Sequence, residues 1–526
     1  MIPPILHQTW KTDEIPPRFR AWSESWAKHN PGWTRMFWND RALIDFVGTH
    51  YPDFLATFCG YQQGILRADA ARYMLLHHFG GVYADLDCEC VASFAPLMSE
   101  DRIVFCKEPF RHFAEQASFR GLPYLLFNGT IVSPPKHPFW LHLLSYLPDL
   151  ADAKEVIDAT GPCVLTSAQL SFADRSSFAL HPSALFTPLD RDGAAGESGE
   201  PQACKTLSVH HWVGTWWKPA PRENWRKALK RHLYKAKYLA TRGEQLDLAE
   251  ARAAIDPAAL ARPAPKPGGN IAVLVPLRDA AEHVEPFLAA VRQLDHPPER
   301  IKLVFCEGDS RDGSWDVLRK AVEPLGGEYR RIVLLQKHLG TELDRARRAL
   351  PKLQRERRCG LAKVRNHLIR NGLDEEDDWA LWIDIDVWKF PDDIVRTLTA
   401  AGHRIVVPNC VLKAGGRSLD FNSFVTTRPQ RDHRYFRSTV RGVYQPPSDF
   451  IGRRHLSDVR HLEKIALDGV GGSMLLVDAA LHRGGLLFPE KPYRDLVETE
   501  GFGVLAKDVG VRAVGLPRVE IFHVPW

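Results

Sequence analysis

The feature that most constrains the fold is a change in composition near the middle of this 526-residue chain. Between Pro219 and Asn270 the sequence becomes basic, then alanine-rich, and finally rich in proline and glycine. Such a segment is typical of a linker, and a single hydrophobic core stops growing at roughly 250–300 residues. The sequence therefore predicts two domains, residues 1–220 and 270–526, joined over residues 221–269 by a basic helix and a Pro/Ala-rich linker.

Both predicted domains alternate short apolar runs with helical patterns. The first has predicted strands at 4–8 and 82–84 and predicted helices at 15–28 and 64–79. The second has predicted strands at 271–276, 301–306, 332–335, 380–383 and 519–522, helices at 281–293 and 313–322, and a mostly helical segment over 341–371. Alternating elements predict an α/β fold with a largely parallel sheet in each domain. Ligands then bind at the carboxyl ends of the strands.

The bulk composition narrows the class of protein. A hydrophobic fraction of 44%, a charged fraction of 25% and a net charge of +5 indicate a soluble protein that does not bind nucleic acid. The start of the chain lacks a signal-peptide pattern, and no run of about 18 apolar residues predicts a membrane span. Nine cysteines without zinc spacing indicate reduced thiols. We therefore expect a cytoplasmic protein, and the abundant Ala, Arg and Pro suggest a bacterial gene.

Acidic pairs of the form Asp-x-Asp carry the clearest chemistry. The chain contains three of them, Asp85 and Asp87, Asp190 and Asp192, and Asp384 and Asp386. The middle pair follows a proline in a polar stretch, which predicts a surface loop. The first and last pairs each close an apolar strand, where two carboxylates can converge on one Mg²⁺ or Mn²⁺ that also binds phosphate oxygens. Capping of the next turn is the simpler interpretation of a single pair, but here the context occurs twice.

Other polar residues accompany each pair at similar spacing. Arg67 lies 18 residues before Asp85, and Arg365 lies 19 residues before Asp384. A polar side chain follows each arginine, namely Asp69 and Asn366. An arginine fork is suited to a diphosphate, although a structural salt bridge is an alternative role. Histidines late in each domain, His210 and His211 in the first and His523 in the second, are candidate third metal ligands, and His211 is the one assigned in the first domain.

The first half resembles glycosyltransferase family 32. The matching residues are Ile5–Trp10, Asn30–Trp33, Leu66–Tyr73, Phe79–Asp87, Thr160–Pro162 and His211–Trp216. The second half resembles glycosyltransferase family 62, the mannan-polymerase subunits of fungi. Its matching residues are Leu274–Ala280, Glu307–Gly313, Lys363–Leu368, Leu381–Val387, Val470–Val477, Glu498–Gly503, Gly515–Pro517 and His523.

Together the resemblances imply two tandem GT-A-type, Rossmann-like domains that transfer sugar with retention of anomeric configuration. Each domain would use one Mn²⁺ or Mg²⁺. The implied donors are GDP-mannose in the second domain and a GDP- or UDP-sugar in the first. The implied catalytic and metal residues are Asp85, Asp87, His211, Asp384, Asp386 and His523, with Glu498 and Glu500 contacting the acceptor or the sugar. The implied nucleotide-binding residues are Trp10, Arg67, Asp69, Tyr83, Pro276, Glu307, Asp309, Arg365 and Asn366.

These observations predict a bifunctional glycosyltransferase that extends a glycan or a lipid-linked glycan. Two alternatives stay open: one domain is catalytic and the other binds glycan, or the chain is a secreted effector that glycosylates host proteins. A glycoside hydrolase is disfavoured, because it needs two carboxylates around the bond and no metal. The basic helix carries Trp225, Leu229, Leu233 and Ala236 at helical spacing. It either docks on an anionic membrane surface, the inner membrane in a bacterium, or packs between the domains.

Overall fold

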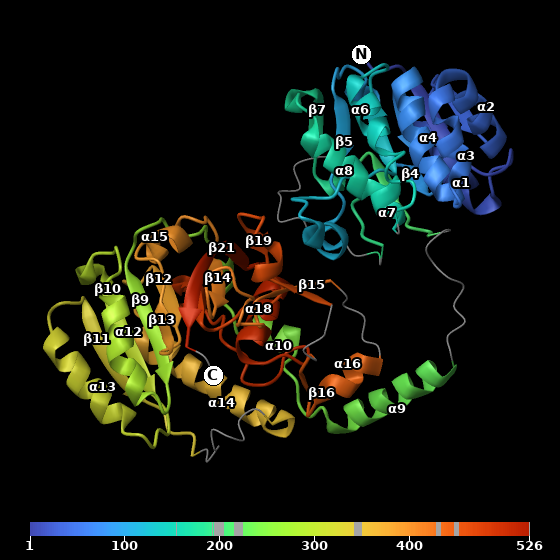
Figure 1. Cartoon of the computed structure of the whole chain (residues 1–526). Helices are drawn as coiled ribbons and strands as arrows, with labels where there is room; N and C mark the ends of the chain where they lie inside the picture. Colours follow the sequence, from blue (N-terminus) through green and yellow to red (C-terminus); the bar gives the residue numbers. More distant parts are fainter. Residues whose placement is uncertain are drawn as a thin grey trace. The chain divides into compact units, whose positions relative to one another are not determined.

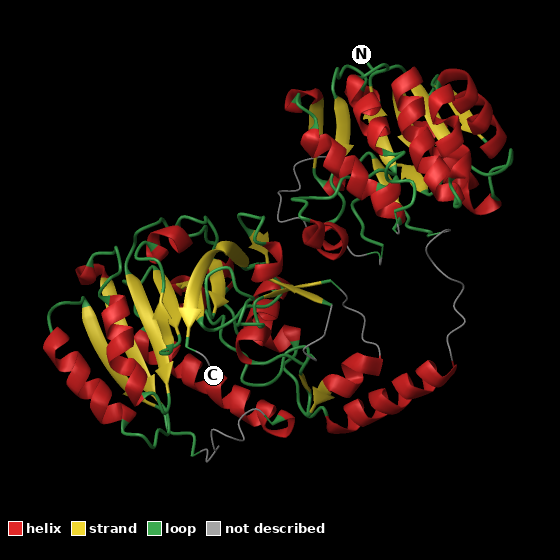
Figure 2. Cartoon of the chain, viewed as in Figure 1, coloured by secondary structure: helices red, strands yellow, loops and turns green. Residues whose placement is uncertain are grey.

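The computed structural model describes residues 1–153, 155–191, 193, 205–214, 225–340, 350–427, 433–446 and 452–524. The chain divides into two compact units, Met1–Arg222 and Glu223–Trp526. Each unit is a mixed α/β structure built around its own sheet, as Figures 1 and 2 show. No helix among the described residues combines the length and apolar character that crossing a bilayer requires.

The first unit has a six-stranded sheet in the order β2-β1-β3-β6-β5-β7. Its strands are β1 Ile5–Thr9, β2 Thr34–Trp38, β3 Gly81–Ala84, β5 Ile103–Cys106, β6 Thr130–Ser133 and β7 Phe178–His181. Strands β2, β1 and β3 run parallel, whereas β6 is antiparallel to both β3 and β5. A separate ribbon pairs β4 Cys88–Cys90 with β8 Ser208–His210. This ribbon places the end of the unit next to the turn that follows β3.

Helices surround this sheet. They are α1 Pro17–His29, α2 Asp40–His50, α3 Leu55–Gly60, α4 Gly64–Phe79, α5 Phe110–His112, α6 Pro138–Tyr146, α7 Val156–Ala159 and α8 Pro162–Ser171. Helix α4 is buried from Asp69 to Leu76, and it ends where Gly80 adopts a φ of +68° that a side chain would disfavour. The chain then enters β3 directly. The predicted boundaries of α4 are confirmed.

The second unit has a nine-stranded sheet in the order β11-β10-β9-β12-β20-β14-β21-β13, with β19 paired to β21. Its strands are β9 Ile271–Leu277, β10 Ile301–Glu307, β11 Arg331–Gln336, β12 Trp379–Ile383, β13 Val387–Lys389, β14 Ile405–Val411, β19 Ile465–Ala466, β20 Met474–Asp478 and β21 Val514–His523. Strands β9, β10, β11 and β12 are parallel, and β20 is antiparallel to β12 and β14. Two short ribbons pair β15 Phe424–Thr426 with β18 Arg453–His455 and β16 Thr439–Val440 with β17 Val443–Tyr444.

The helices of this unit include three in the segment before its first strand. They are α9 Trp225–Thr241, α10 Leu248–Ala253, α11 Pro257–Ala261, α12 Val284–Val291, α13 Ser314–Val322, α14 Gln354–Gly372, α15 Ile394–Thr399, α16 His433–Ser438, α17 Ala479–Arg483 and α18 Glu498–Asp508. The main core lies between the sheet and helices α12, α13 and α15. Its strands are continuous apolar runs, as expected for parallel strands covered on both faces.

Several expectations need correction. Both sheets are largely parallel, as predicted, but each contains strands that run antiparallel, β6 in the first and β20, β13 and β19 in the second, because burial of an apolar run does not reveal its direction. Asp190 is buried and paired with Arg111 at 2.9 Å, so it is not in an exposed surface loop; Asp192 lies outside the described residues. The predicted helix over 281–293 begins as a 3-10 turn, and that over 15–28 begins two residues later, at Pro17. Of the segment 341–371, residues 341–349 lie outside the described residues, and α14 spans most of the rest.

The predicted linker also differs from a free connection. Its backbone forms hydrogen bonds with the second unit. Leu246 N donates to Pro492 O, and Asp256 N donates to Gly484 O. The guanidinium of Arg404 reaches the carbonyls of Ala259 and Leu260. Residues 223–269 therefore belong with the second unit and not between the two.

Candidate active sites

The first acidic pair occupies the turn between β3 and β4. Asp85 follows β3 directly, and its backbone N–H donates to Gly129 O at 2.8 Å. One carboxylate oxygen, Oδ1, accepts hydrogen bonds from the Tyr83 hydroxyl at 3.1 Å and from Arg72 Nη2 at 3.2 Å. Burial raises the pKa of Asp85, while the adjacent Arg72 opposes that shift. The strand end thus presents a carboxylate held in one orientation by an arginine and a tyrosine.

Arg72 is the arginine of this site, and the sequence analysis did not identify it. Its side chain on α4 is buried, and Nη2 also lies 2.8 Å from Asp69 Oδ1. Asp69 further accepts hydrogen bonds from Thr160 and Asn128, and burial raises its pKa to about 7. The predicted Arg67 instead donates to Tyr61 O at 2.8 Å and approaches Asp40. Residues 67 and 72 are five positions apart, which turns their side chains by about 140° on a helix.

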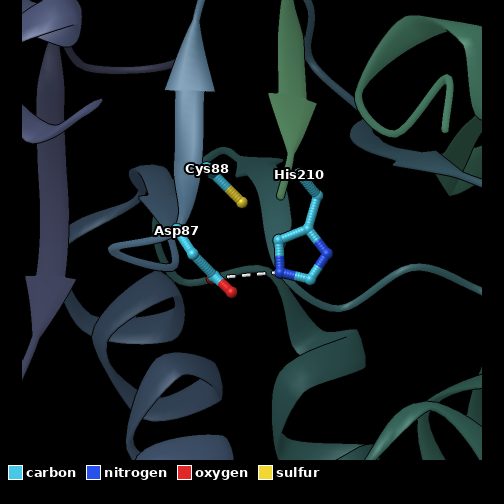
Figure 3. Close-up of side chains that lie close together, drawn as sticks. All are labelled: Asp87, Cys88 and His210. Carbon is cyan, nitrogen blue, oxygen red and sulfur yellow. Dashed lines mark hydrogen bonds and ion pairs between the residues drawn. The ribbon is translucent and has the colours of Figure 1, made fainter. Parts of the chain in front are cut away.

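Asp87, two residues on, is paired with a histidine. Asp87 Oδ1 lies 3.0 Å from His210 Nε2, and Oδ2 accepts the Val213 N–H at 3.0 Å, as Figure 3 shows for the side-chain pair. Although burial acts in the opposite direction, His210 lowers the pKa of Asp87 to about 2. Asp87 in turn raises the pKa of His210 against the effect of burial.

The histidine that faces Asp87 is therefore His210 and not the predicted ligand His211. His211 Nε2 contacts Glu89 at 2.9 Å, and its ring stacks on Trp22 at 4.1 Å. Because successive side chains along a strand point to opposite faces, His210 and His211 cannot both face Asp87. Both histidines are visible in the sequence. Only the register of β8 against β4 shows which of them faces Asp87.

A divalent cation fits this donor set. Ligand atoms of Asp87, Cys88 and His210 lie within 4.8 Å of one another, and Figure 3 shows the three side chains converging. Burial raises the pKa of the Cys88 thiol well above its usual value, and its Sγ donates to Gly129 O. Mn²⁺ and Mg²⁺ prefer carboxylate oxygens, and neither favours a protonated thiol over an imidazole nitrogen. Asp87 and His210 are therefore the candidate ligands, together with Asp85.

The remaining predicted residues of this unit lie near the same strand ends. Tyr83 is buried on β3, and its hydroxyl also bonds the Thr9 hydroxyl at 2.9 Å. Trp10 directly follows β1, the neighbour of β3, and is half-buried with its ring 5.4 Å from Phe19. Stacking of Trp10 on a nucleotide base stays a prediction.

The second acidic pair repeats this arrangement. Asp384 follows β12, and Arg365 Nη2 lies 3.1 Å from its Oδ1. Asp386 Oδ1 lies 3.0 Å from His523 Nε2, at the end of β21. Burial raises the pKa of Asp384 to about 7, while a hydrogen bond from His523 outweighs burial and lowers the pKa of Asp386. The same directions of shift are found in the first unit.

His523 has the orientation of a ligand. Its Nδ1 lies 2.6 Å from Val524 O and donates there, so Nε2 is the ring nitrogen that faces Asp386. A backbone partner of this kind is typical of metal-binding histidines. In the first unit His210 Nε2 faces Asp87 in the same way, and its buried Nδ1 has no hydrogen-bond partner among the described residues.

Arginines from two elements, α14 and β18, surround the carboxylates of α18. Glu498 Oε1 accepts Arg365 Nε at 2.9 Å, so Arg365 bridges Glu498 and Asp384. Glu500 is buried, and its two oxygens accept Arg358 at 2.7 Å and Arg453 at 2.9 Å. These arginines outweigh burial and lower the pKa of Glu500. Both oxygens of Glu500 are therefore paired inside the protein, and its contact with an acceptor stays a prediction.

Two glycines explain how Arg365 reaches its position. A Cβ on Gly472 would lie 2.5 Å from Arg365 Nη2, and one on Gly471 would lie 1.8 Å from Asp420 Oδ2. The Gly471-Gly472 pair in the sequence therefore marks close approach of charged side chains. Asp420, which the sequence analysis did not single out, accepts the Ser473 N–H at 3.3 Å beside this site.

Asn366 and the polar residues at the end of β10 form hydrogen bonds with other groups of the protein. Asn366 is buried, and its amide bonds Phe488 O and Glu490 Oε1, both at 2.9 Å. It therefore fixes the loop after α17, and its contact with a nucleotide stays a prediction. Glu307 accepts Ser310 N and Gln336 Nε2, and Asp309 accepts Leu339 N.

Pro276 on β9 is half-buried beside Cys306 of β10. Because β12, β9 and β10 are neighbours in that order, their carboxyl ends form one edge near Asp384. The roles predicted for Pro276, Glu307 and Asp309 in binding a donor stay predictions.

Comparison with known proteins places these sites in context. Residues 262–492 match the family model Anp1, and residues 16–104 match the model described as glycosyltransferase sugar-binding region containing DXD motif. The chain is 32% identical over 248 residues to mannan polymerase complex subunit mnn9 of Schizosaccharomyces pombe, covering 44% of this chain and 74% of that protein.

A second relative is an enzyme of lipid mannosylation by its name. The chain is 36% identical over 147 residues to mannosyl phosphorylinositol ceramide synthase SUR1 of Saccharomyces cerevisiae, covering 28% of this chain and 35% of that protein. Among solved structures, the mannosyltransferase PcManGT from Pyrobaculum calidifontis, in complex with GDP-Man and Mn²⁺, is 16% identical with a TM-score of 0.29, covering 56% of this chain and 68% of that one.

Proposed function

We propose that this chain, which belongs to the Anp1 family of glycosyltransferases, transfers mannose from nucleotide-linked donors at two separate sites, one in each unit. The observation that carries the proposal is the repeated constellation of four side chains. In each unit an arginine holds the first aspartate of the pair and a histidine holds the second. The Asp–His contacts are 3.0 Å in both units, and the Arg–Asp contacts are 3.2 and 3.1 Å.

The chemistry follows from the position of these groups. A bound Mn²⁺ or Mg²⁺ would neutralise the diphosphate of the donor and so stabilise the leaving group. Asp87 and His210, or Asp386 and His523, would hold the ion, with Asp85 and Asp384 beside it. The arginine would keep the first aspartate ionised and oriented, which matters because burial raises the pKa of both Asp85 and Asp384.

We assign mannose as the transferred sugar in both units. The relatives include a mannan polymerase subunit, a mannosyl phosphorylinositol ceramide synthase and inositol phosphoceramide mannosyltransferase 3 of Schizosaccharomyces pombe. We assign extension of a mannose-containing glycan to the second unit, which carries the Anp1 match. The first unit would then act on an inositol-phosphate-bearing lipid, by analogy with the ceramide mannosyltransferases. GDP-mannose would serve both units, with retention of configuration as the family resemblances imply.

A single catalytic unit with a glycan-binding partner is less well supported. A domain retained only for binding could replace the whole buried Arg–Asp pair by apolar residues at little cost in stability. Both units nevertheless keep the arginine, the histidine and the acidic pair at matching distances.

The test is a donor and acceptor screen on the full chain. GDP-mannose, UDP-mannose, UDP-glucose and UDP-GlcNAc would be supplied with Mn²⁺, using α-mannobiose or inositol phosphoceramide as acceptor. We expect mannosylated products from GDP-mannose only, and none after chelation by EDTA until Mn²⁺ is restored. Full transfer in chelator would refute the metal sites, and preference for a UDP-sugar would refute the donor assignment.

Charge-matched variants separate the two units in this screen. Asp386→Asn is expected to abolish the mannobiose product alone, and Asp87→Asn the lipid product alone. The exposed residues Asp392 and Asp101 provide controls, because their change to Asn removes the same charge from the same unit outside the sites. Loss of both products in either site variant would mean that the units are not independent.

A further inference from the structure

Helix α9 has a well-defined inner face that packs on the second unit. Tyr238 is buried, its ring lies 5.3 Å from Phe436 of α16, and its hydroxyl lies 2.9 and 3.0 Å from the two oxygens of Asp495. Tyr234, one turn earlier, is half-buried. Helices α9 and α16 lie side by side (Figure 1). The tyrosines therefore mark the side of the helix that faces its own unit.

The opposite face of α9 is apolar and exposed. Leu233 is 63% exposed and Leu239 is 55% exposed, and Ala236 and Ala240 are exposed as well. At about 100° per residue, Leu233, Ala236 and Ala240 lie roughly 140–160° around the helix from Tyr238. Trp225 and Leu229 continue the same spacing in the sequence. The second unit does not cover this apolar stripe over its described residues.

The charge of α9 is entirely positive. The helix contains six lysines and arginines and no aspartate or glutamate in 17 residues. Lys230, Lys235 and Lys237 are exposed. Lys230 and Lys237 lie within about 60° of Leu233, so cationic side chains border the apolar stripe. Such a combination is typical of helices that lie in the plane of a membrane surface.

We infer that the apolar stripe of α9, residues 233, 236, 239 and 240 with the lysines beside it, docks on an anionic lipid surface. A bilayer satisfies both parts of the helix, because the leucines enter the acyl boundary while the lysine ammonium groups reach the headgroups. The phosphates of a nucleic acid would pair with the lysines and leave the leucines in water. Charge complementarity and the apolar stripe together therefore select lipid as the occupant.

Docking of α9 would also orient the second acidic pair relative to the membrane. This step rests on the proposed function. Tyr238 bonds Asp495, three residues before Glu498, and Glu498 bonds the Arg365 that holds Asp384. The docking helix is thus joined by a short series of contacts to the second acidic pair. A lipid-linked acceptor would be presented to a site whose orientation to the membrane is fixed.

Vesicle sedimentation of the full chain tests the inference without donor or metal, so a failure of catalysis cannot alter the result. We expect binding to vesicles of phosphatidylcholine mixed with phosphatidylglycerol, and little binding to phosphatidylcholine alone. Binding should weaken in about 1 M salt, where the Debye length shrinks to about 3 Å. Lys230→Gln combined with Lys235→Gln and Lys237→Gln should lower the partition coefficient about 100-fold, since each basic residue contributes about fivefold.

The matched control changes three exposed lysines elsewhere in the second unit, Lys320, Lys413 and Lys464, to Gln. It should bind like the unmodified protein, whereas Leu233→Gln with Leu239→Gln should bind several-fold more weakly. Equal sedimentation with both kinds of vesicle, or none with either, would overturn the inference and leave α9 as a surface for protein packing. Retention of binding by the α9 lysine variant would overturn it too.

Discussion

At the scale of single residues, each acidic pair depends on partners that lie far away in the sequence. Asp87 and Asp386 each lie against a histidine from the last strand of the same unit. His523 was predictable, because it stands alone after an apolar run. His210 was not, because the neighbouring His211 is equally suited in type and only the register of β8 separates them. The residue types therefore predicted that a histidine accompanies each acidic pair. Strand geometry determined which histidine it is.

The same contrast applies to the two arginines of the first unit and yields a mutational prediction. Arg72→Lys should reduce transfer by the first unit about 100-fold, because lysine cannot reproduce the fork that joins Asp69 and Asp85. Arg67→Lys should stay within about threefold of the unmodified rate, since its guanidinium contacts Tyr61 O and Asp40. Rates of mannosyl transfer to the lipid acceptor provide the measurement. Equal losses in both variants would contradict the geometry.

Two buried histidines outside the sites predict how stability depends on pH. His482 accepts a hydrogen bond from Trp382 Nε1 at 3.1 Å and donates to Leu486 O, and burial lowers its pKa to about 4. His7 in the first unit is likewise bonded to Trp38 and Gly80, and burial lowers its pKa to about 4. Both rings are therefore neutral in the folded protein.

A histidine that is neutral when folded binds its proton more tightly in the unfolded chain. The stability that neutral His482 contributes is therefore complete above about pH 6.5 and is lost as the pH falls from 6.5 towards 4, by on the order of 3 kcal/mol. His482→Gln should flatten this acid decline, because glutamine can accept from Trp382 and donate to Leu486 without titrating. Calorimetric unfolding between pH 4 and 8 is the measurement. His232→Gln, at an exposed position, is the control and should leave the decline unchanged.

At the scale of elements, strand ends were easier to predict than strand directions. The apolar runs 271–276, 301–306 and 380–383 became β9, β10 and β12 almost residue for residue. The sequence analysis missed β14 and β20, and β20 is antiparallel to β12. A fully buried strand is apolar whichever way it runs, so composition could not supply that topology.

The segment between the predicted domains is a structural part of the second unit, and this can be tested. Tyr238→Phe removes the hydroxyl that donates to the buried Asp495. Because the buried carboxylate of Asp495 then loses one hydrogen-bond donor, we expect the free energy of unfolding to fall by about 1–3 kcal/mol. Transfer by the second unit should fall several-fold, because Asp495 precedes Glu498, while the first unit stays unaffected.

Tyr234→Phe provides the matched control for this variant. Tyr234 lies one turn earlier on α9, and its hydroxyl makes no hydrogen bond to any described residue. It should therefore change neither the unfolding midpoint nor the rate. If both tyrosine variants lost activity equally, the bond to Asp495 would not be the cause, and the effect would belong to helix packing in general.

At the scale of the whole molecule, the account requires two complete sites in one chain. The sequence predicted two domains of similar architecture, and the structure has two compact units that each repeat the Arg–Asp and Asp–His contacts. The repeat is one of geometry, since the arginines lie 13 and 19 residues before their aspartates. A comparison of motifs along the chain could not reveal it, because only the fold shows which arginine faces which carboxylate.

The most direct test of the two-site account is the number of GDP molecules that one chain binds in the presence of Mn²⁺. Isothermal titration of the full chain should give a stoichiometry of about two, and chelation should abolish binding. Asp87→Asn and Asp386→Asn should each reduce the stoichiometry to about one, and the double variant should bind none. A stoichiometry of one in the unmodified chain, eliminated entirely by either single variant, would contradict the account.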